Sequence, residues 1–397
     1  MIKLLTYHDI DQQQWRDLIE RSSTATWFQT DEAYRFYQSV GGMQAFAVGV
    51  VECAERNQRA NPSKDLKVLN DLNDLNDRNN GATDRLVGVI VGYITRERNA
   101  IKQYFTRRAI IIGGPLLDEH ISDEALSALL SAVKNLPILN PSLKGRTLDT
   151  TKQSPFPSGE GRGEAYTPLP PGRAGVGLPI YIETRNFHDY SRWKEVFETC
   201  GFLYQPHYDI HVHCNAQHQM SERRQRELKR AIKNGAMVCE AQTEQEVRDW
   251  YQILHRLYQE KVRTPLFSEE FFLQFYRNGV GKYLFVKHEG KVIGGMMCPI
   301  LDGKAIYEWF VCGLDEEYRE QSPSVVATHA AIEYAKNNGL PLFDFMGAGV
   351  PEVPYGVREF KREFGGEIVE YGRFLCIRKL LLYWIGKMGV KWLKRKR

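Results

Sequence analysis

Hydrophobic and polar positions follow the same order in two separate parts of the chain. In the first part, mainly apolar runs over Leu86–Ile94 and Ala109–Glu119 predict two strands. The amphipathic segment Asp123–Asn135, which follows Ser122, predicts a helix. The same order of strand, strand and helix returns about 205 residues later, and a repeat of this length indicates two tandem copies of one domain.

In the second copy, Lys291–Ile300 and Ala305–Glu316 are the matching strands. Ser322 is the expected N-cap of the helix that follows, Pro323 is its first residue, and Asn338 is its end. Because 397 residues are too many for one ordinary core, we expect an α/β fold (α+β in its mixed sheets) with tandem domains. Each domain should be a mixed central sheet flanked by helices.

The predicted limits of the two domains are 1–200 and 201–376, and a C-terminal basic helix follows over 377–397. Two segments of the first domain, at about 54–85 and 138–177, have no counterpart in the second. Both are polar and rich in Gly, Pro, Asn or Asp, without apolar periodicity, so we expect disordered loop insertions on the surface. We assign no function to them.

Composition restricts the class of protein. A hydrophobic fraction of 43%, a charged fraction of 26% and a net charge of +4 are typical of a globular protein that is no polyelectrolyte. Seven cysteines without a CxxC pair indicate reduced thiols and a cytoplasmic location. The N-terminus lacks the features of a signal peptide, and no apolar run reaches the roughly 18–20 residues that span a bilayer.

The most specific motif follows the last predicted strand of the second copy. Leu340–Met346 predicts a buried strand, and Gly347–Gly366 forms a Gly- and Pro-rich turn and a short charged helix before a further strand, Glu367–Phe374. Such a turn is a usual place for a ligand in α/β proteins. The run Gly-Val-Arg-Glu-Phe-Lys-Arg-Glu-Phe-Gly in this segment resembles the Phe-Lys signature of FemAB-type aminoacyltransferases. These belong to the acetyltransferase (GNAT-like) superfamily and extend the peptide of cell-wall precursors.

The resemblance implies acyl transfer to an amine, with Lys361 and Phe360 at the reacting ester. Lys361 would stabilise negative charge on the tetrahedral intermediate or the leaving group. No protein nucleophile is needed if the acyl group arrives activated, and the chain has no G-x-S-x-G motif. Asp344 is the best carboxylate candidate for the base, or else it is a buried acid bonded to loop N–H groups. Tyr355 and Arg358 are candidates to bind substrate anions or hydroxyls.

The acyl donor stays open between aminoacyl-tRNA and acyl-CoA, and no bound cofactor is expected. Ordinary acetyltransferases hold a pyrophosphate with a Gly-rich turn at a helix N-terminus. The equivalent turn, Tyr318–Val326, offers Arg319 and hydroxyls but no Gly-x-Gly, which weakens the CoA alternative. FemAB-type proteins depart from the Gly-rich pattern in a similar way.

Acceptor-binding residues are expected in the first copy, where Ala25–Tyr37 resembles the start of the FemAB acceptor-binding domain. Gln29, Arg35, Tyr104 and Arg108 are candidates to hold the phosphates and peptide of a precursor.

Three histidines on the predicted strand Tyr208–His213 or just before it, His207, His211 and His213, share one face. We predict no metal site, because no further ligand with suitable spacing joins them, and we place His207 in a substrate groove.

Two basic segments suggest partners. The helix Ser221–Asn234 carries six Lys or Arg and would contact the phosphates of a tRNA or a precursor, or else be a solvated amphipathic helix. Residues 378–397 carry eight Lys or Arg and no acid, with Leu381, Trp384 and Trp392 on one helical face. This helix fits an anionic membrane surface, or else packs against the protein.

The sequence therefore predicts an acyltransferase that adds an amino acid from aminoacyl-tRNA to a peptidoglycan precursor, at the inner face of the membrane. One alternative is an acyl-CoA-dependent N-acyltransferase that acts on an amino sugar or another envelope metabolite. The other is a membrane-associated binding scaffold without catalysis.

Overall fold

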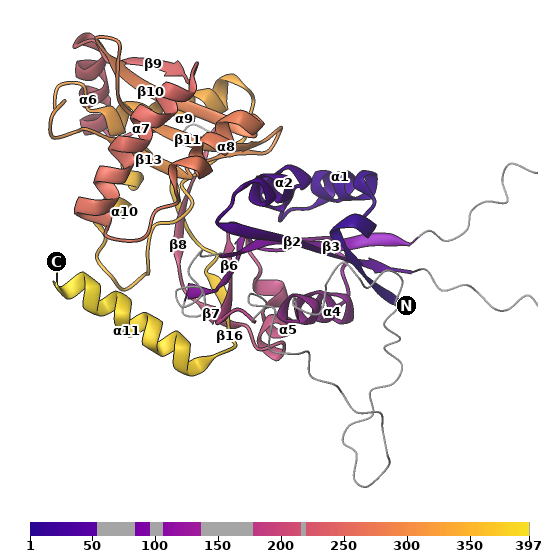
Figure 1. The fold of residues 1–397 in the computed structure, drawn as a ribbon. Coiled ribbons are helices and arrows are strands. Elements are labelled where there is room, and N and C mark those ends of the chain that lie inside the picture. Colours follow the sequence, from indigo (N-terminus) through magenta and orange to yellow (C-terminus); the bar gives the residue numbers. More distant parts are fainter. Residues whose placement is uncertain (54–83, 96–105, 136–177, 216–219, 397) are drawn as a thin grey trace, which may run out of the picture.

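A computed structural model describes residues 1–53, 84–95, 106–135, 178–215 and 220–396 (Figure 1). The predicted insertion at 138–177 lies outside the described residues, and so does nearly all of the one at 54–85. The described chain forms two mixed sheets of eight strands, each flanked by helices. This is the expected fold class.

The first sheet has the strand order β1-β2-β3-β4-β6-β16-β7, and β5 pairs with β3. Its strands are β1 (Ile2–Thr6), β2 (Met43–Glu52), β3 (Arg85–Thr95), β4 (Ala109–Gly113), β5 (Leu116–Leu117), β6 (Tyr181–Asn186), β7 (Leu203–Gln205) and β16 (Arg373–Ile377). The second sheet has the order β15-β8-β14-β12-β11-β10-β9, and β13 pairs with β11. Its strands are β8 (Tyr208–His213), β9 (Met237–Glu240), β10 (Gly281–His288), β11 (Lys291–Leu301), β12 (Ala305–Tyr307), β13 (Phe310–Gly313), β14 (Leu342–Asp344) and β15 (Glu367–Glu370).

Helices cover both sheets, and most begin where the sequence places a capping residue. Ser122, Ser221 and Thr243 each accept a backbone N–H of the helix that they precede. The α-helices are α1 (Gln12–Arg21), α2 (Asp31–Ser39), α4 (Asp123–Lys134), α5 (Lys194–Thr199), α6 (Glu222–Lys233), α7 (Glu244–Leu257), α8 (Glu269–Asn278), α9 (Pro323–Asn337), α10 (Gly356–Arg362) and α11 (Leu380–Lys396). Short helical turns are η1 (Tyr7–Asp9), η2 (Trp27–Gln29), η4 (Ser191–Trp193) and the π-helical η5 (Tyr258–Val262).

The expected duplication is present in the topology. In the first sheet, α4 lies in the sequence between the parallel neighbours β4 and β6, and in the second α9 lies between the parallel neighbours β12 and β14. The remaining pairs in each copy are antiparallel, as in the β2·β3 and β10·β11 pairs. Each copy therefore has one parallel connection through a helix, in the same place.

Strands from beyond the predicted first domain complete the first sheet, which differs from the predicted domain limits. Both β7 and β16 begin within 201–376, yet β16 pairs with β6 and with β7 in the first sheet. The predicted single strand Glu367–Phe374 is also two strands, because Gly372, with φ +63°, separates β15 in the second sheet from β16 in the first. The chain therefore crosses between the sheets twice, before β8 and after β15.

An aromatic core joins the two copies. Trp27 and Phe28 of η2 pack against Trp309, with ring centroids 5.9 Å and 5.0 Å apart. Phe36 of α2 contacts Phe271 of α8 at 5.1 Å. These rings are almost completely buried apart from Trp309, so the domains share one apolar core and bury it against each other.

The C-terminal helix α11 extends from the end of β16, and Figure 1 shows it in yellow, leading away from the first sheet. The helix itself was predicted. Its large apolar side chains are exposed, with 74% of Leu381, 50% of Trp384 and 69% of Met388 open to solvent. Among the described helices none is long and apolar enough to cross a membrane.

Candidate active site

A tightly folded loop connects β14 to α10 and forms the centre of the predicted site. Its backbone turns through left-handed conformations at Met346, Gly347 and Gly349, with φ of +56°, +127° and +84°. Glycine adopts such angles without steric cost, whereas Met346 is held there against its preference. The surrounding side chains must therefore fix this loop firmly.

Lys361 is one of the side chains that fix it. Its ammonium donates to the backbone oxygens of Phe345 and Gly347, at 2.8 Å and 2.9 Å, and pairs with Glu308 Oε1 at 3.0 Å. An ammonium has three N–H groups, so all three have partners. Lys361 is 7% exposed and points into the protein rather than into solvent. Its contact with a reacting ester stays a prediction, and that contact would require one of these bonds to open.

Arg358 holds the same loop from the first turn of α10. Its guanidinium donates to the backbone oxygens of Ala348 and Val350, at 2.8 Å and 2.5 Å, and lies over the ring of Tyr208 at 5.0 Å. With 8% exposure, it is committed to the protein. In the structure Arg358 shapes the loop, and its contact with a substrate stays a prediction.

Phe360 and Tyr355 flank these two cations differently. The half-buried Phe360 points toward α6, where its ring lies 4.5 Å from the guanidinium of Arg224 and 5.2 Å from the ring of Phe364. Tyr355, at the start of α10, is 44% exposed. Among the predicted site residues Tyr355, Arg358, Phe360 and Lys361, Tyr355 is thus the one whose side chain is exposed to an incoming molecule.

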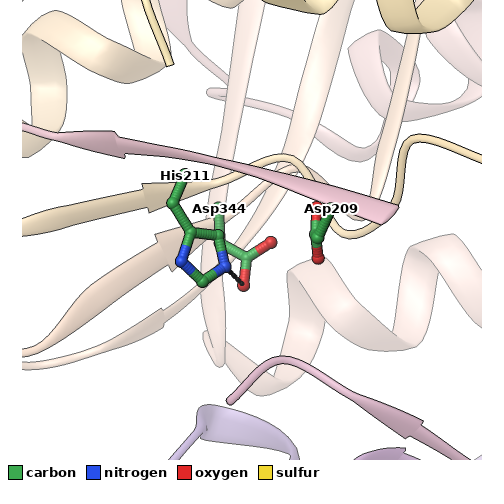
Figure 2. Close-up of side chains that lie close together, drawn as sticks. All are labelled: Asp209, His211 and Asp344. Atoms are coloured by element: carbon green, nitrogen blue, oxygen red, sulfur yellow. Dashed lines mark ion pairs between the residues drawn. The ribbon is translucent and has the colours of Figure 1, made fainter. Parts of the chain in front are cut away.

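A cluster of buried ionisable groups lies beneath the loop (Figure 2). Asp344 of β14 is directly opposite His211 of β8 in the antiparallel register, and Asp209 precedes His211 by two residues on the same strand. Residues two apart share one face of a strand, so all three side chains lie on the same side of the sheet. His211 Nε2 is 3.4 Å from Asp344 Oδ2.

Backbone N–H groups hold both carboxylates of this cluster. Asp344 Oδ1 accepts the N–H of Met346 at 2.6 Å, and Asp209 Oδ1 accepts those of Ile210 and Gly347, both at 2.7 Å. Asp344 therefore matches the second of its two predicted alternatives, a buried acid bonded to loop N–H groups. It has no exposed surface, so a role as base would need a route to the substrate.

Protonation of this cluster is shifted by burial and by mutual charge. Burial, reinforced by the Asp344 carboxylate, raises the pKa of Asp209 well above its usual value. Burial alone would lower the pKa of His211, but Asp344 beside it outweighs that effect and raises the pKa. Burial also raises the pKa of Glu308, although Lys361 acts in the opposite direction. Sequence analysis missed Glu308 and Asp209. For Asp209, the available signal was the run Asp-Ile-His on an alternating strand.

His207 lies beside the loop at the crossing between the sheets. Its Nε2 accepts a hydrogen bond from the Arg373 guanidinium at 2.9 Å, and Arg373 also pairs with Glu183 at 2.8 Å. Burial and the nearby Arg373 charge lower the pKa of His207 to about 4. His207 is therefore a neutral acceptor at pH 7, and its place in a substrate groove stays a prediction.

The predicted acceptor-binding residues of the first domain differ in their exposure to solvent. Gln29 is completely buried, donates to the backbone oxygens of Gly113 and Gly114, and accepts the N–H of Thr26. It cannot reach a precursor, so this prediction was wrong. Three further candidates are Arg35, which is exposed and pairs with Asp31 at 2.6 Å, Arg108, which is exposed, and Tyr104, which lies outside the described residues.

An acetyltransferase would hold pyrophosphate at the N-terminus of α9. In this protein the carboxylate of Asp315 already bonds there. Asp315 accepts both the N–H and the hydroxyl of Ser324, at 3.0 Å and 2.5 Å. Ser322 occupies the N-cap position, as predicted, but its hydroxyl bonds to Glu227 and to the backbone of Arg319 instead of capping the helix. The Arg319 side chain is exposed on this turn.

Comparison with known proteins supports the class that the fold indicates. Residues 217–362 match the family model of the acetyltransferase (GNAT) domain. The crystal structure of FemX matches with a TM-score of 0.59 at 12% identity, covering 95% of this chain and 98% of that one. A search of curated proteins found no match.

Two further solved structures match less closely. A tandem GNAT protein from the clavulanic acid biosynthesis pathway has a TM-score of 0.49 at 10% identity, covering 94% of this chain and 98% of that one. L-PGS from Bacillus licheniformis has a TM-score of 0.47 at 12% identity, with 76% and 85% covered.

Residues 217–362 of the second domain thus match a GNAT acetyltransferase domain, and the chain is an acyltransferase whose two domains have a GNAT-like fold. FemX, a FemAB-type protein, shares the fold of nearly the whole chain.

Proposed function

We propose that the protein transfers an aminoacyl group from aminoacyl-tRNA to an amine of a peptidoglycan precursor. The amine nitrogen forms a bond to the ester carbonyl carbon, the bond from that carbon to the ribose oxygen breaks, and the amine proton passes to this oxygen, which becomes a hydroxyl. This reaction needs no protein nucleophile, because the ester is already activated. The fold shared with FemX over both domains supports the proposal.

The N-terminus of α9, where Asp315 already bonds, is the observation that favours this donor over acyl-CoA. The carboxylate of Asp315 already bonds to the N–H of Ser324 and would repel a pyrophosphate placed there. The equivalent helix of the first domain, α4, is arranged similarly, because Glu52 accepts the N–H and hydroxyl of Ser122 at 3.1 Å and 2.6 Å. Both GNAT-like copies therefore present an acid where acetyltransferases bind an anion.

The outer face of α6 supports an RNA partner. Its basic side chains are exposed, and their acidic partners lie at long distances, 3.5 Å from Arg223 to Glu363 and 3.9 Å from Arg226 to Glu222. The exposed cations of this face are Arg223, Arg226, Lys229, Arg230 and Lys233. In the proposal this face contacts phosphates of the tRNA acceptor stem.

The loop between β14 and α10 would position the ester. Lys361 and Arg358 hold its backbone, and Tyr355 is exposed beside it. Phe360 packs behind this arrangement against α6, so the Phe-Lys step connects the loop to the basic helix. The exposed Arg35 and Arg108 of the first domain are the acceptor-binding candidates that remain in the proposal.

An anionic membrane surface is a further proposed partner, through α11. The exposed apolar face includes Leu381, Trp384 and Met388, and Lys387 lies over the ring of Trp384 at 5.2 Å. An amphipathic helix with basic flanks binds at the interface of such a membrane. This would bring the enzyme to a lipid-linked precursor on the inner face.

The GNAT family match favours a second candidate, an acyl-CoA-dependent N-acyltransferase that acts on an amino sugar or envelope metabolite. One assay separates the two. The purified chain is incubated with charged total tRNA and a UDP-linked or lipid-linked precursor, and the product is analysed by mass spectrometry. We expect a gain of one aminoacyl residue, and no gain when the charged tRNA is treated with RNase before the reaction.

Two other results would contradict the proposal. Acylation by acyl-CoA, with no product from charged tRNA, would establish the second candidate. No product from either donor, together with a growth phenotype that Lys361→Met and Tyr355→Phe leave unchanged, would indicate a binding scaffold.

A further inference from the structure

We propose that Asp209, His211 and Asp344 form a site for one divalent transition-metal ion of the zinc or manganese class. This site does not depend on the acyl donor and acceptor proposed above. The sequence predicted no metal site, because no further ligand with suitable spacing joins its three histidines. In the structure only His211 of those three joins two buried carboxylates (Figure 2).

The spacing of the three side chains fits a common metal ion. Each offers one ligand atom, and these atoms all lie within 4.8 Å of one another. The distance of 3.4 Å between His211 Nε2 and Asp344 Oδ2 exceeds that of a charge-assisted hydrogen bond, about 2.7–2.9 Å. Two ligands that bind one tetrahedral ion at about 2.0–2.1 Å lie about 3.3–3.4 Å apart. The pair is therefore spaced as two ligands of one ion.

Two of the atoms that would bind the ion lack a hydrogen bond. His211 Nε2 and Asp344 Oδ2 are both buried, lie opposite each other at 3.4 Å and make no hydrogen bond within the described residues. The other oxygen of Asp344 is held by a backbone N–H, and Oδ1 of Asp209 is held by two. Such outer bonds orient a carboxylate and leave its second oxygen for a metal. Unpaired polar atoms at this depth are costly unless something binds them.

The charge of the buried groups around the three ligands also favours a bound cation. Three carboxylates, Asp209, Asp344 and Glu308, are buried here, and Lys361 supplies one ammonium. If all three carboxylates were ionised and the imidazole neutral, these groups would carry two net negative charges inside the protein. A dication balances them, and the alternative is that two protons do so.

The ligand set indicates the class of ion and its role. One imidazole nitrogen with two carboxylates suits zinc, manganese or iron(II), whereas magnesium and calcium prefer oxygen ligands alone. The ligands are only 0–4% exposed, so the ion would be closed off from substrate. The ion would have a structural role, because it would link β8 to β14 below the loop that begins at Met346.

Metal analysis of the full-length protein tests this inference. The chain is purified without a histidine tag and without chelators, and its zinc, manganese, iron, cobalt, nickel and copper are measured by mass spectrometry. We expect about one equivalent of one of these metals per chain. Removal with a chelator should lower the melting temperature, and Co²⁺ added back should restore it and produce a visible absorption band.

Variants locate the ion. His211→Gln and Asp344→Asn should each lower metal retention by at least about tenfold, since each removes a ligand. The matched control is His213→Gln on the same strand, because His213 is exposed and pairs with Glu367 at 3.5 Å. It should keep the full metal content. Circular dichroism confirms that each variant is folded.

Two results would overturn the inference. Wild-type protein with no metal, and with no change in melting temperature when Zn²⁺, Mn²⁺ or Co²⁺ is added, would show that protons neutralise the cluster. Retention of metal in folded His211→Gln and Asp344→Asn would place the ion elsewhere. Since neither measurement involves tRNA, CoA or a precursor, failure here leaves the proposed function untouched.

Discussion

Replacing Lys361 with methionine separates two roles for its ammonium. Methionine keeps the length of the side chain and removes the charge. The buried ion pair with Glu308 at 3.0 Å is then broken from one side, and the backbone oxygens of Phe345 and Gly347 lose a donor. Breaking a buried pair in this way costs about 3–5 kcal/mol. Because Glu308 can take up a proton, we expect a loss near the lower end of that range.

The measurement is urea unfolding at pH 7, with Arg362→Met as the matched control. Arg362 is the next residue of α10, and its side chain is 54% exposed and pairs with Glu359 at 3.3 Å. Its loss should cost less than about 1 kcal/mol. The double variant Lys361→Met/Glu308→Gln should lose less stability than the two single variants added together, because it leaves no buried charge.

An unfolding free energy for Lys361→Met within about 0.5 kcal/mol of the Arg362→Met value would refute the role of Lys361 in holding the loop. If that variant is as stable as the control but transfers the acyl group about 10²–10³ times more slowly, the ammonium acts at the ester, as the family resemblance implies. A loss of stability together with a loss of activity identifies a positioning residue. The two measurements therefore distinguish the roles.

Two further predictions concern protonation and the membrane. Burial and the neighbouring His211 lower the pKa of His188 to about 4 from an ordinary 6.5. As the pH drops, His188 is therefore protonated in the unfolded chain before it is protonated in the folded protein. The unfolding free energy should fall as pH drops from about 6.5 toward 4. His188→Gln should make that fall shallower in urea unfolding measured across this range, and an unchanged slope would contradict it. Trp384→Glu with Leu381→Glu on α11 should weaken sedimentation with anionic vesicles by at least about tenfold, whereas Leu203→Glu, at an exposed apolar position on β7, should not. Equal binding by both variants would remove α11 from the proposed surface.

Periodicity predicted the elements well, because each depends on residues close in sequence. The helices over 123–134, 222–233 and 323–337 lie where the apolar spacing and the capping positions placed them. The duplication was visible for the same reason, since each copy repeats its own local pattern. The placement of β7 and β16 in the first sheet was not visible in the sequence, because strand pairing depends on partners distant in the sequence.

The site shows the same limit at the level of side chains. The sequence placed Lys361 and Arg358 on a charged helix after a strand, which is where they are. It could not show that both point inward to loop carbonyls, because that depends on how the helix packs. The alternating strand predicted that His211 and His213 share a face, but only the register with β14 places Asp344 opposite His211. Gln29 looked available for binding because burial depends on tertiary contacts.

The two crossings between the sheets also constrain how the protein matures on the ribosome. Strand β6 has β4 on one side and β16 on the other, while β7 pairs with β16 alone. Chains emerge from their N-terminal end, so β6 presents an unpaired edge until β16 has been synthesised. The first sheet is therefore completed only after every strand of the second sheet has left the ribosome.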